Sequence, residues 1–156
     1  MTVFFLPGPG QLFNEVGEFI SAALDQQIPS ISHRSKQFEQ ISEKAVSGVR
    51  SLLGVPATHQ IFFLGSGTEA MERIVQNLVR EHSFHFVNGA FSARFHEIAE
   101  DLGKKAVAHN SKLGSGFDFE NVKVPNEAEL ICVTQNETSI GVATPEAQIH
   151  ALARRY

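Results

Sequence analysis

The stretch IFFLGSGTEAMERIVQNLVREHSFHFV, residues 61–87, decides the fold class. An apolar run at Ile61–Leu64 leads into the small polar turn Gly65–Thr68, a segment with helical spacing follows over Glu69–His82, and Phe84–Val87 is again apolar. Short apolar runs bounded by turn residues are typical of buried strands. The stretch therefore predicts a strand, a helix and a second strand in succession.

The same alternation continues on both sides of this stretch. Apolar residues at helical spacing predict three more helices, over residues 12–25, 36–53 and 92–102. Further apolar runs predict strands at Lys105–Ala108 and Leu130–Thr134, and Thr144 and Pro145 begin a last helix. We therefore expect one α/β domain over residues 1–156, with three αβα layers and a largely parallel sheet.

Composition excludes several classes of protein. Hydrophobic residues make up 42% and charged residues 19% of the 156 residues, which excludes a disordered chain. The net charge of −4 offers no electrostatic footprint for nucleic acid or an anionic membrane, and no apolar run reaches transmembrane length. The single cysteine, Cys132, excludes an internal disulfide and a cysteine-based metal cluster, so we expect a cytoplasmic protein that binds no metal.

Ligands of parallel sheets collect at the carboxyl ends of the strands, where three segments are of interest. Ser66, Gly67 and Thr68 follow the first strand and could bind an anion at a helix N-terminus, although they could equally form a plain helix cap. Phe91 follows the second strand and could cover a planar ligand, with core packing as the alternative. The polar run 134–142 follows a later strand and could instead be a solvated loop.

His33 and Arg34 lie away from the strand ends, ahead of the helix predicted over residues 36–53. The guanidinium of Arg34 could bind a carboxylate or a phosphate through its fork of donors. The alternative is a simple helix entrance, capped by Ser32 or Ser35. By their chemistry alone, these residues favour the helix entrance.

Five segments together resemble the class V aminotransferases, pyridoxal-phosphate enzymes with the aspartate-aminotransferase fold. In chain order they are Pro7–Gly10, Ser32–Phe38, Gly65–Glu72, Gly89–Ser92 and Asn136–Gly141. The second and the fifth are most similar to phosphoserine aminotransferases. The turn Gly65–Thr68 is closer to the alanine–glyoxylate and serine–pyruvate members, so substrate identity stays open between these branches.

The resemblance implies a role for each candidate residue. It assigns the phosphate of pyridoxal phosphate to Ser66, Gly67 and Thr68. Phe91 would stack on the pyridine ring, where phosphoserine aminotransferases usually have tryptophan, and Thr138 would hydrogen-bond the cofactor near its phenolic oxygen. His33 and Arg34 would face the acidic groups of the substrate. Small-molecule amino and keto acids and a second copy of the protein are the implied partners.

The resemblance also implies what these 156 residues lack. In the family the lysine that forms the Schiff base and the carboxylate that faces the pyridine nitrogen lie on later strands. None of the six lysines here follows the segment Asn136–Gly141. We therefore expect no catalytic residue in this chain, which would be the N-terminal half of the large cofactor domain without the small C-terminal domain.

The resulting functional hypothesis is an aminotransferase acting on glutamate and 3-phosphohydroxypyruvate. An alanine–glyoxylate or serine–pyruvate aminotransferase is the alternative within the family. A desulfurase is disfavoured because Cys132 lies in a predicted strand. From a different class, the chain could be a non-catalytic remnant that binds a phosphorylated ligand through Gly67 and Thr68.

Overall fold

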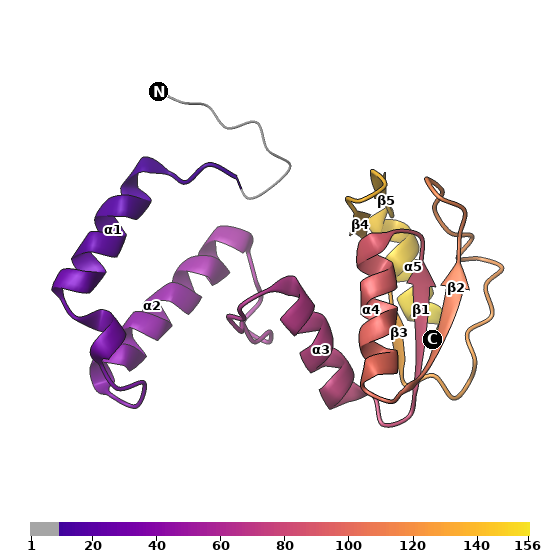
Figure 1. The fold of residues 1–156 in the computed structure, drawn as a ribbon, viewed down its shortest axis with the longest axis horizontal. Coiled ribbons are helices and arrows are strands. Elements are labelled where there is room, and N and C mark those ends of the chain that lie inside the picture. Colours follow the sequence, from indigo (N-terminus) through magenta and orange to yellow (C-terminus); the bar gives the residue numbers. More distant parts are fainter. Residues whose placement is uncertain (1–9) are drawn as a thin grey trace. The chain divides into compact units, whose positions relative to one another are not determined.

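The computed structural model describes residues 10–156, which divide into two compact units between Phe62 and Phe63 (Figure 1). Pro7, Gly8 and Pro9 of the first family-like segment lie outside the described residues. The first unit holds α1 (Asn14–Asp25), a 3-10 turn (Ile28–Ser30) and α2 (Lys36–Leu53). The second holds α3 (Gly67–Leu78), β1 (His82–Val87), α4 (Ala90–Asp101), β2 (Lys105–Asn110), β3 (Leu130–Cys132), β4 (Asn136–Glu137), β5 (Val142–Ala143) and α5 (Glu146–Arg155).

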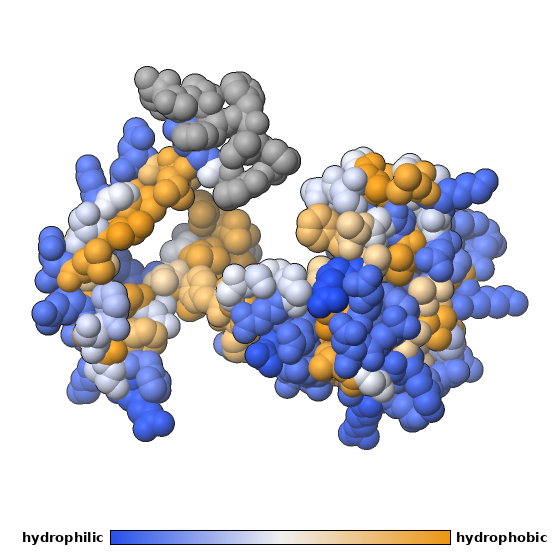
Figure 2. Space-filling view, viewed as in Figure 1, coloured by the Kyte–Doolittle hydropathy of each residue, from blue (hydrophilic) through white to orange (hydrophobic). Residues whose placement is uncertain are grey.

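Helix α2 of the first unit has a clear signal at each end. The hydroxyl of Ser35 accepts a hydrogen bond from the N–H of Phe38 at 3.2 Å, which satisfies one free donor of the first turn. Gly54 ends the helix with a φ of 63°, a left-handed conformation that glycine adopts without steric cost. Helix α1 has no side-chain cap at its start. An apolar stripe on this helix is exposed, as Figure 2 shows, and it includes Phe19 and Leu24.

The second unit is built on a parallel sheet with the order β2-β1-β3. Strand β1 pairs with β2 in the register His82↔Lys105, and with β3 in the register Ser83↔Leu130. Because β1 and β3 are parallel neighbours, their carboxyl ends lie at the same edge of the sheet. That edge receives the two segments that follow these strands, residues 88–92 and 133–139.

Helices cover both faces of this sheet, as Figure 1 shows. Phe84 and Phe86 of β1 share a buried cluster with Leu152 of α5 on one face. On the other face, Val75 of α3 packs with Ala99 of α4. The predicted αβα layers and parallel sheet are confirmed.

The helix predicted over residues 69–82 ends at Leu78, because residues 82–87 form β1, and two further features differ from the sequence prediction. Ile61–Leu64 is not a strand, because no described strand pairs with it; Phe62 and Phe63 are instead exposed. The segment after β3 is more ordered than predicted, since β4 and β5 form an antiparallel hairpin with the pair Glu137↔Val142. This hairpin brings the polar run 134–142 back toward the sheet edge.

Candidate functional site

Helix α4 begins at the carboxyl end of β1 without a capping side chain of the usual kind. Its N-cap position is Gly89, which has no side chain to accept the free N–H groups of the first turn. The hydroxyl of Ser92 accepts the N–H groups of Asn88 and Gly89, each at 3.0 Å, so it serves the residues before the helix. The N–H groups of Ala90, Phe91 and Ser92 therefore need acceptors from another segment.

The β4–β5 hairpin supplies those acceptors. One carboxylate oxygen of Glu137 accepts the N–H of Ser92 at 2.8 Å, and the other accepts the N–H of Phe91 at 3.3 Å. The hydroxyl of Ser139 accepts the N–H of Ala90 at 2.9 Å and donates to Glu137 at 2.6 Å. Three consecutive N–H groups of α4 are thus bound by two side chains that lie more than 40 residues further along the chain.

This contact is close enough to require glycine at position 89. A Cβ there would lie 2.5 Å from Cγ and 2.6 Å from Cδ of Glu137, and 2.6 Å from the hydroxyl oxygen of Ser139. Real Cβ atoms essentially never come so close to another heavy atom. Gly89 therefore allows the hairpin to lie directly against the start of α4.

The carboxylate of Glu137 is fully buried and stays ionised. Burial alone disfavours its charged form. Hydrogen bonds from Ser139, Ser92 and Phe91 outweigh that effect and hold the pKa of Glu137 below its ordinary value. The positive end of the α4 dipole favours the same negative charge.

Phe91 and Thr138 both lie at this edge of the sheet, each in a segment that follows the carboxyl end of a strand. Phe91 is the second residue of α4; its side chain is 50% exposed, so the ring can cover a ligand. Thr138 is exposed in the turn between β4 and β5, directly after Glu137. Glu137 binds the backbone of Phe91 and is covalently joined to Thr138, so it links the two candidate residues.

The start of α3 is compatible both with a plain helix cap and with an anion site at the Gly-Ser-Gly-Thr turn. The hydroxyl of Ser66 accepts the N–H of Glu69 at 3.1 Å, so the predicted helix cap is present. The N–H groups of Gly67 and Thr68 donate to no protein acceptor among residues 10–156, and both residues are exposed. An anion could bind these donors.

The carboxylate of Glu69, at the same helix start, opposes such an anion. Its charge is partly balanced, because it accepts the N–H of Gly65 at 2.8 Å and lies 3.8 Å from the guanidinium of Arg73. Thr68 also lines a small hollow with Arg94 of α4. Glu72 and Asp101 line the same hollow, and Asp101 lies 3.5 Å from the guanidinium of Arg94, so the free donors at this helix start lie near several carboxylates.

His33 and Arg34 belong to the first unit. They line a shallow depression with Phe38 and Glu39 on the first turn of α2. The N–H of Arg34 donates to the hydroxyl of Ser32 at 3.2 Å, and Ser35 caps the helix, so the predicted helix entrance is also present. The guanidinium of Arg34 makes no ion pair within the described part of the chain.

Glu137 and Ser139 are the residues to which the sequence assigned no role. Both belong to the segment Asn136–Gly141, for which a solvated loop was an equally good interpretation of the sequence. One signal could have identified them: a helix that begins after glycine needs an acceptor from elsewhere in the chain. A carboxylate at the next strand end is a good candidate for that acceptor.

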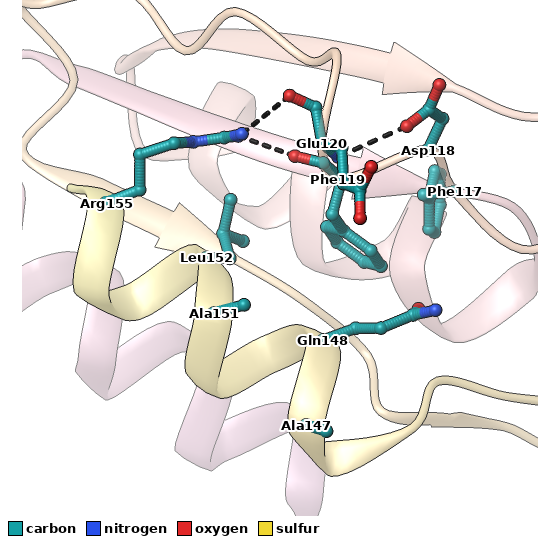
Figure 3. A pocket seen from close by; sticks show the side chains of 9 residues that line it. All are labelled: Phe117, Asp118, Phe119, Glu120, Ala147, Gln148, Ala151, Leu152 and Arg155. Carbon is teal, nitrogen blue, oxygen red and sulfur yellow. Dashed lines mark hydrogen bonds between the residues drawn. The ribbon is translucent and has the colours of Figure 1, made fainter.

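A hollow of about 510 Å³ lies on the sheet face that α5 covers, between residues 117–120 and α5 (Figure 3). The charged groups of Asp118 and Arg155 in its lining are already hydrogen-bonded. Arg155 donates to the carbonyl oxygens of Glu120 at 2.7 Å and Phe119 at 2.6 Å, and the carboxylate of Asp118 accepts from Asn121. The hollow lies away from the sheet edge that holds Phe91 and Thr138, so it is a poor candidate for the cofactor site.

Among residues 10–156, the structure has no cluster of three or more side chains suited to a metal ion. No helix in the same range combines the length and the apolar character needed to span a bilayer.

Comparison with known proteins gives consistent results. The family description "Aminotransferase class-V" matches residues 4–156. Phosphoserine aminotransferase of Burkholderia lata is 32% identical over 94% of this chain and 44% of its own length. That of Ralstonia nicotianae is 29% identical, over 91% of this chain and 42% of its own length. The chain thus spans less than half the length of these relatives.

Solved structures agree with this result. A phosphoserine aminotransferase from Cytophaga hutchinsonii superposes with a TM-score of 0.87 and 44% identity, over 95% of this chain and 41% of that one. A phosphoserine aminotransferase with bound pyridoxal phosphate, from Trichomonas vaginalis, superposes with a TM-score of 0.72 at 19% identity, which shows the shared fold.

Proposed function

Because the chain belongs to the class V aminotransferase family, we propose that the protein containing it is a pyridoxal-phosphate-dependent aminotransferase that moves an amino group between glutamate and 3-phosphohydroxypyruvate. The observation that carries the proposal is the joining of Phe91 and Thr138 at one sheet edge through Glu137. The names of the relatives support the choice of a phosphorylated substrate. The proposal includes the expectation that this chain forms the N-terminal half of the cofactor domain, with the reactive lysine outside it.

The described residues fit pyridoxal phosphate by the chemistry of their donors. The half-exposed ring of Phe91 offers a face for a planar ring, and the exposed hydroxyl of Thr138 offers a hydrogen bond to a ring substituent. Ser66, Gly67 and Thr68 offer two free N–H groups and two hydroxyls to a phosphate. When bound, pyridoxal phosphate supplies the electron sink that allows amino-group transfer.

The residues of the first unit would serve the substrate. The guanidinium of Arg34 can bind a carboxylate or phosphate in a bidentate manner, and His33 can donate a further hydrogen bond. Both residues are exposed. In the full-length protein, Arg34→Ala should raise KM for glutamate and 3-phosphohydroxypyruvate with little change in kcat. An unchanged KM would remove Arg34 from the site.

A homodimer and a cytoplasmic location complete the proposal. The exposed apolar stripe on α1, with Phe19 and Leu24, and Phe13 just before the helix support association with another protein surface. The free, buried thiol of Cys132 suits a reducing compartment. Light scattering coupled to gel filtration of the full-length protein should give twice the monomer mass, and a monomer would contradict the dimer.

The cofactor assignment can be tested with two matched helix caps in the full-length protein. Ser66→Ala and Ser35→Ala each remove a side-chain N-cap, which costs about 1 kcal/mol of stability in either helix. Only Ser66→Ala should also weaken pyridoxal phosphate binding, measured by spectral titration of the apoprotein. Equal affinity in the two variants would contradict a phosphate site at the start of α3.

A further inference from the structure

Glu137 occupies a position that the proposed chemistry does not itself require. Its side chain is 0% exposed, and both of its carboxylate oxygens are engaged by Phe91, Ser92 and Ser139. A carboxylate so enclosed has no free face toward solvent or a ligand. Its function must therefore act through the groups that it holds.

The groups held by Glu137 are those on either side of the candidate cofactor site. On one side it binds the backbone N–H of Phe91, at 3.3 Å, and of the next residue, at 2.8 Å. On the other side it precedes Thr138 in the chain and accepts the hydroxyl of Ser139. The separation between the Phe91 ring and the Thr138 hydroxyl is thus set largely by one carboxylate.

The contact also leaves little room for the two segments to shift. Gly89 lies so close to the hairpin that even a methyl group would collide with Glu137 and Ser139. A hydrogen bond to an ionised carboxylate is about twice as strong as one between neutral groups. Charge and close packing together hold the hairpin in one position against α4.

We propose that Glu137 is the positioning residue of the cofactor site, which holds Phe91 and Thr138 at the separation that pyridoxal phosphate requires without touching the cofactor. The inference rests on the proposed function, because it presumes that Phe91 and Thr138 bind this cofactor. It predicts that neutralising Glu137 weakens the binding of pyridoxal phosphate beyond the effect expected from the loss of apoprotein stability alone.

Glu129 provides a solvent-exposed comparison carboxylate in the same unit. One of its carboxylate oxygens accepts the N–H groups of Arg80 and Glu81 at 2.8 Å and of His82 at 3.2 Å. It therefore also binds three donors, at the amino end of β1, which is the opposite edge of the sheet from Phe91 and Thr138. A purely structural carboxylate should behave like Glu129.

The experiment compares Glu137→Gln with Glu129→Gln in the full-length protein. In Glu137→Gln the amide NH₂ faces the donors of Ser92 or of Phe91 and Ser139, so one side of the contact is lost. Apoprotein stability is measured by thermal unfolding. The dissociation constant of pyridoxal phosphate is measured by titration, and visible circular dichroism reports how the bound cofactor is held.

We expect both variants to lower the apoprotein Tm, and only Glu137→Gln to raise the dissociation constant, by about tenfold, and to reduce the visible circular dichroism of the bound cofactor. Ser139→Ala removes a single donor to Glu137 and should give a smaller rise, of about threefold, which keeps the test valid if Glu137→Gln does not fold. A dissociation constant within twofold of the wild type in Glu137→Gln, or in Ser139→Ala if that is the variant that folds, would overturn the positioning role. A wild-type protein that does not bind pyridoxal phosphate would instead refute the proposed function.

Discussion

The replacement Gly89→Ala tests the central contact of the second unit most severely. The added Cβ would lie 2.5 Å from Cγ of Glu137 and 2.6 Å from the Ser139 hydroxyl. Normal contacts between such atoms require well over 3 Å, so the hairpin must move away from α4. Any such movement pulls the Glu137 carboxylate away from the N–H of Ser92, which it binds at 2.8 Å.

The expected cost has two parts. Overpacking by one methyl group in a tight site costs about 1–3 kcal/mol. If the hydrogen bond between Ser92 and the charged Glu137 is also lost, roughly 1.5–3 kcal/mol is added. We therefore expect Gly89→Ala to lower the free energy of unfolding by about 2.5–6 kcal/mol when both parts apply, a large part of the stability of a typical domain.

The assay is urea unfolding of the full-length apoprotein, with Gly116→Ala as its control. A Cβ at Gly116 meets nothing within 4 Å, so this second variant should stay within about 0.5 kcal/mol of the wild type. If Gly89→Ala also stays within that range, the hairpin does not lie against α4 as described. Glu137 would then not link Phe91 to Thr138.

Three further predictions concern other parts of the chain. Burial, together with the nearby His96, lowers the pKa of His85 to about 4, so below pH 6.5 the unfolded chain binds a proton that the folded chain does not. The free energy of unfolding should therefore fall by roughly 2 kcal/mol between pH 7 and 4.5 through this group. Urea unfolding should show a smaller fall over this pH range in His85→Gln, and an unchanged pH dependence would contradict the role of His85. Burial also raises the pKa of Cys132 to about 12, so mass spectrometry should find its peptide unlabelled by a thiol reagent until urea unfolds the protein, and rapid labelling of the native state would contradict its placement. Gly48→Ala, at an exposed position inside α2, should raise the free energy of unfolding by about 0.5–1 kcal/mol, and a loss of stability would show that this face of α2 is covered.

Local signals in the sequence predicted the helices well. The α2 bounds match the prediction, Lys36–Leu53, because Ser35 and Gly54 mark its ends through their own side-chain and backbone properties. The apolar run Ile61–Leu64 failed as a strand because a strand also needs a partner, and nothing in its sequence shows whether one is present. Propensity determines such a segment only in part.

In the site, too, local sequence signals are informative, whereas contacts between distant segments are not visible in the sequence. Strand-end position marked the segments that hold Phe91 and Thr138, which parallel neighbours bring to one edge, but their roles came from the family resemblance and stay predictions. The role of Glu137 depends on a contact between segments 45 residues apart, which composition and spacing do not reveal. Only the missing side chain at Gly89 indicated that α4 needed an acceptor from elsewhere.

The proposed activity is tested most directly by a substrate comparison with the full-length protein. Formation of 2-oxoglutarate from glutamate should depend on added pyridoxal phosphate, with kcat/KM at least tenfold higher for 3-phosphohydroxypyruvate than for unphosphorylated hydroxypyruvate or glyoxylate. That result would support an aminotransferase for a phosphorylated keto acid. Preference for glyoxylate would place the protein with the alanine–glyoxylate enzymes, and absence of any transfer would contradict the account.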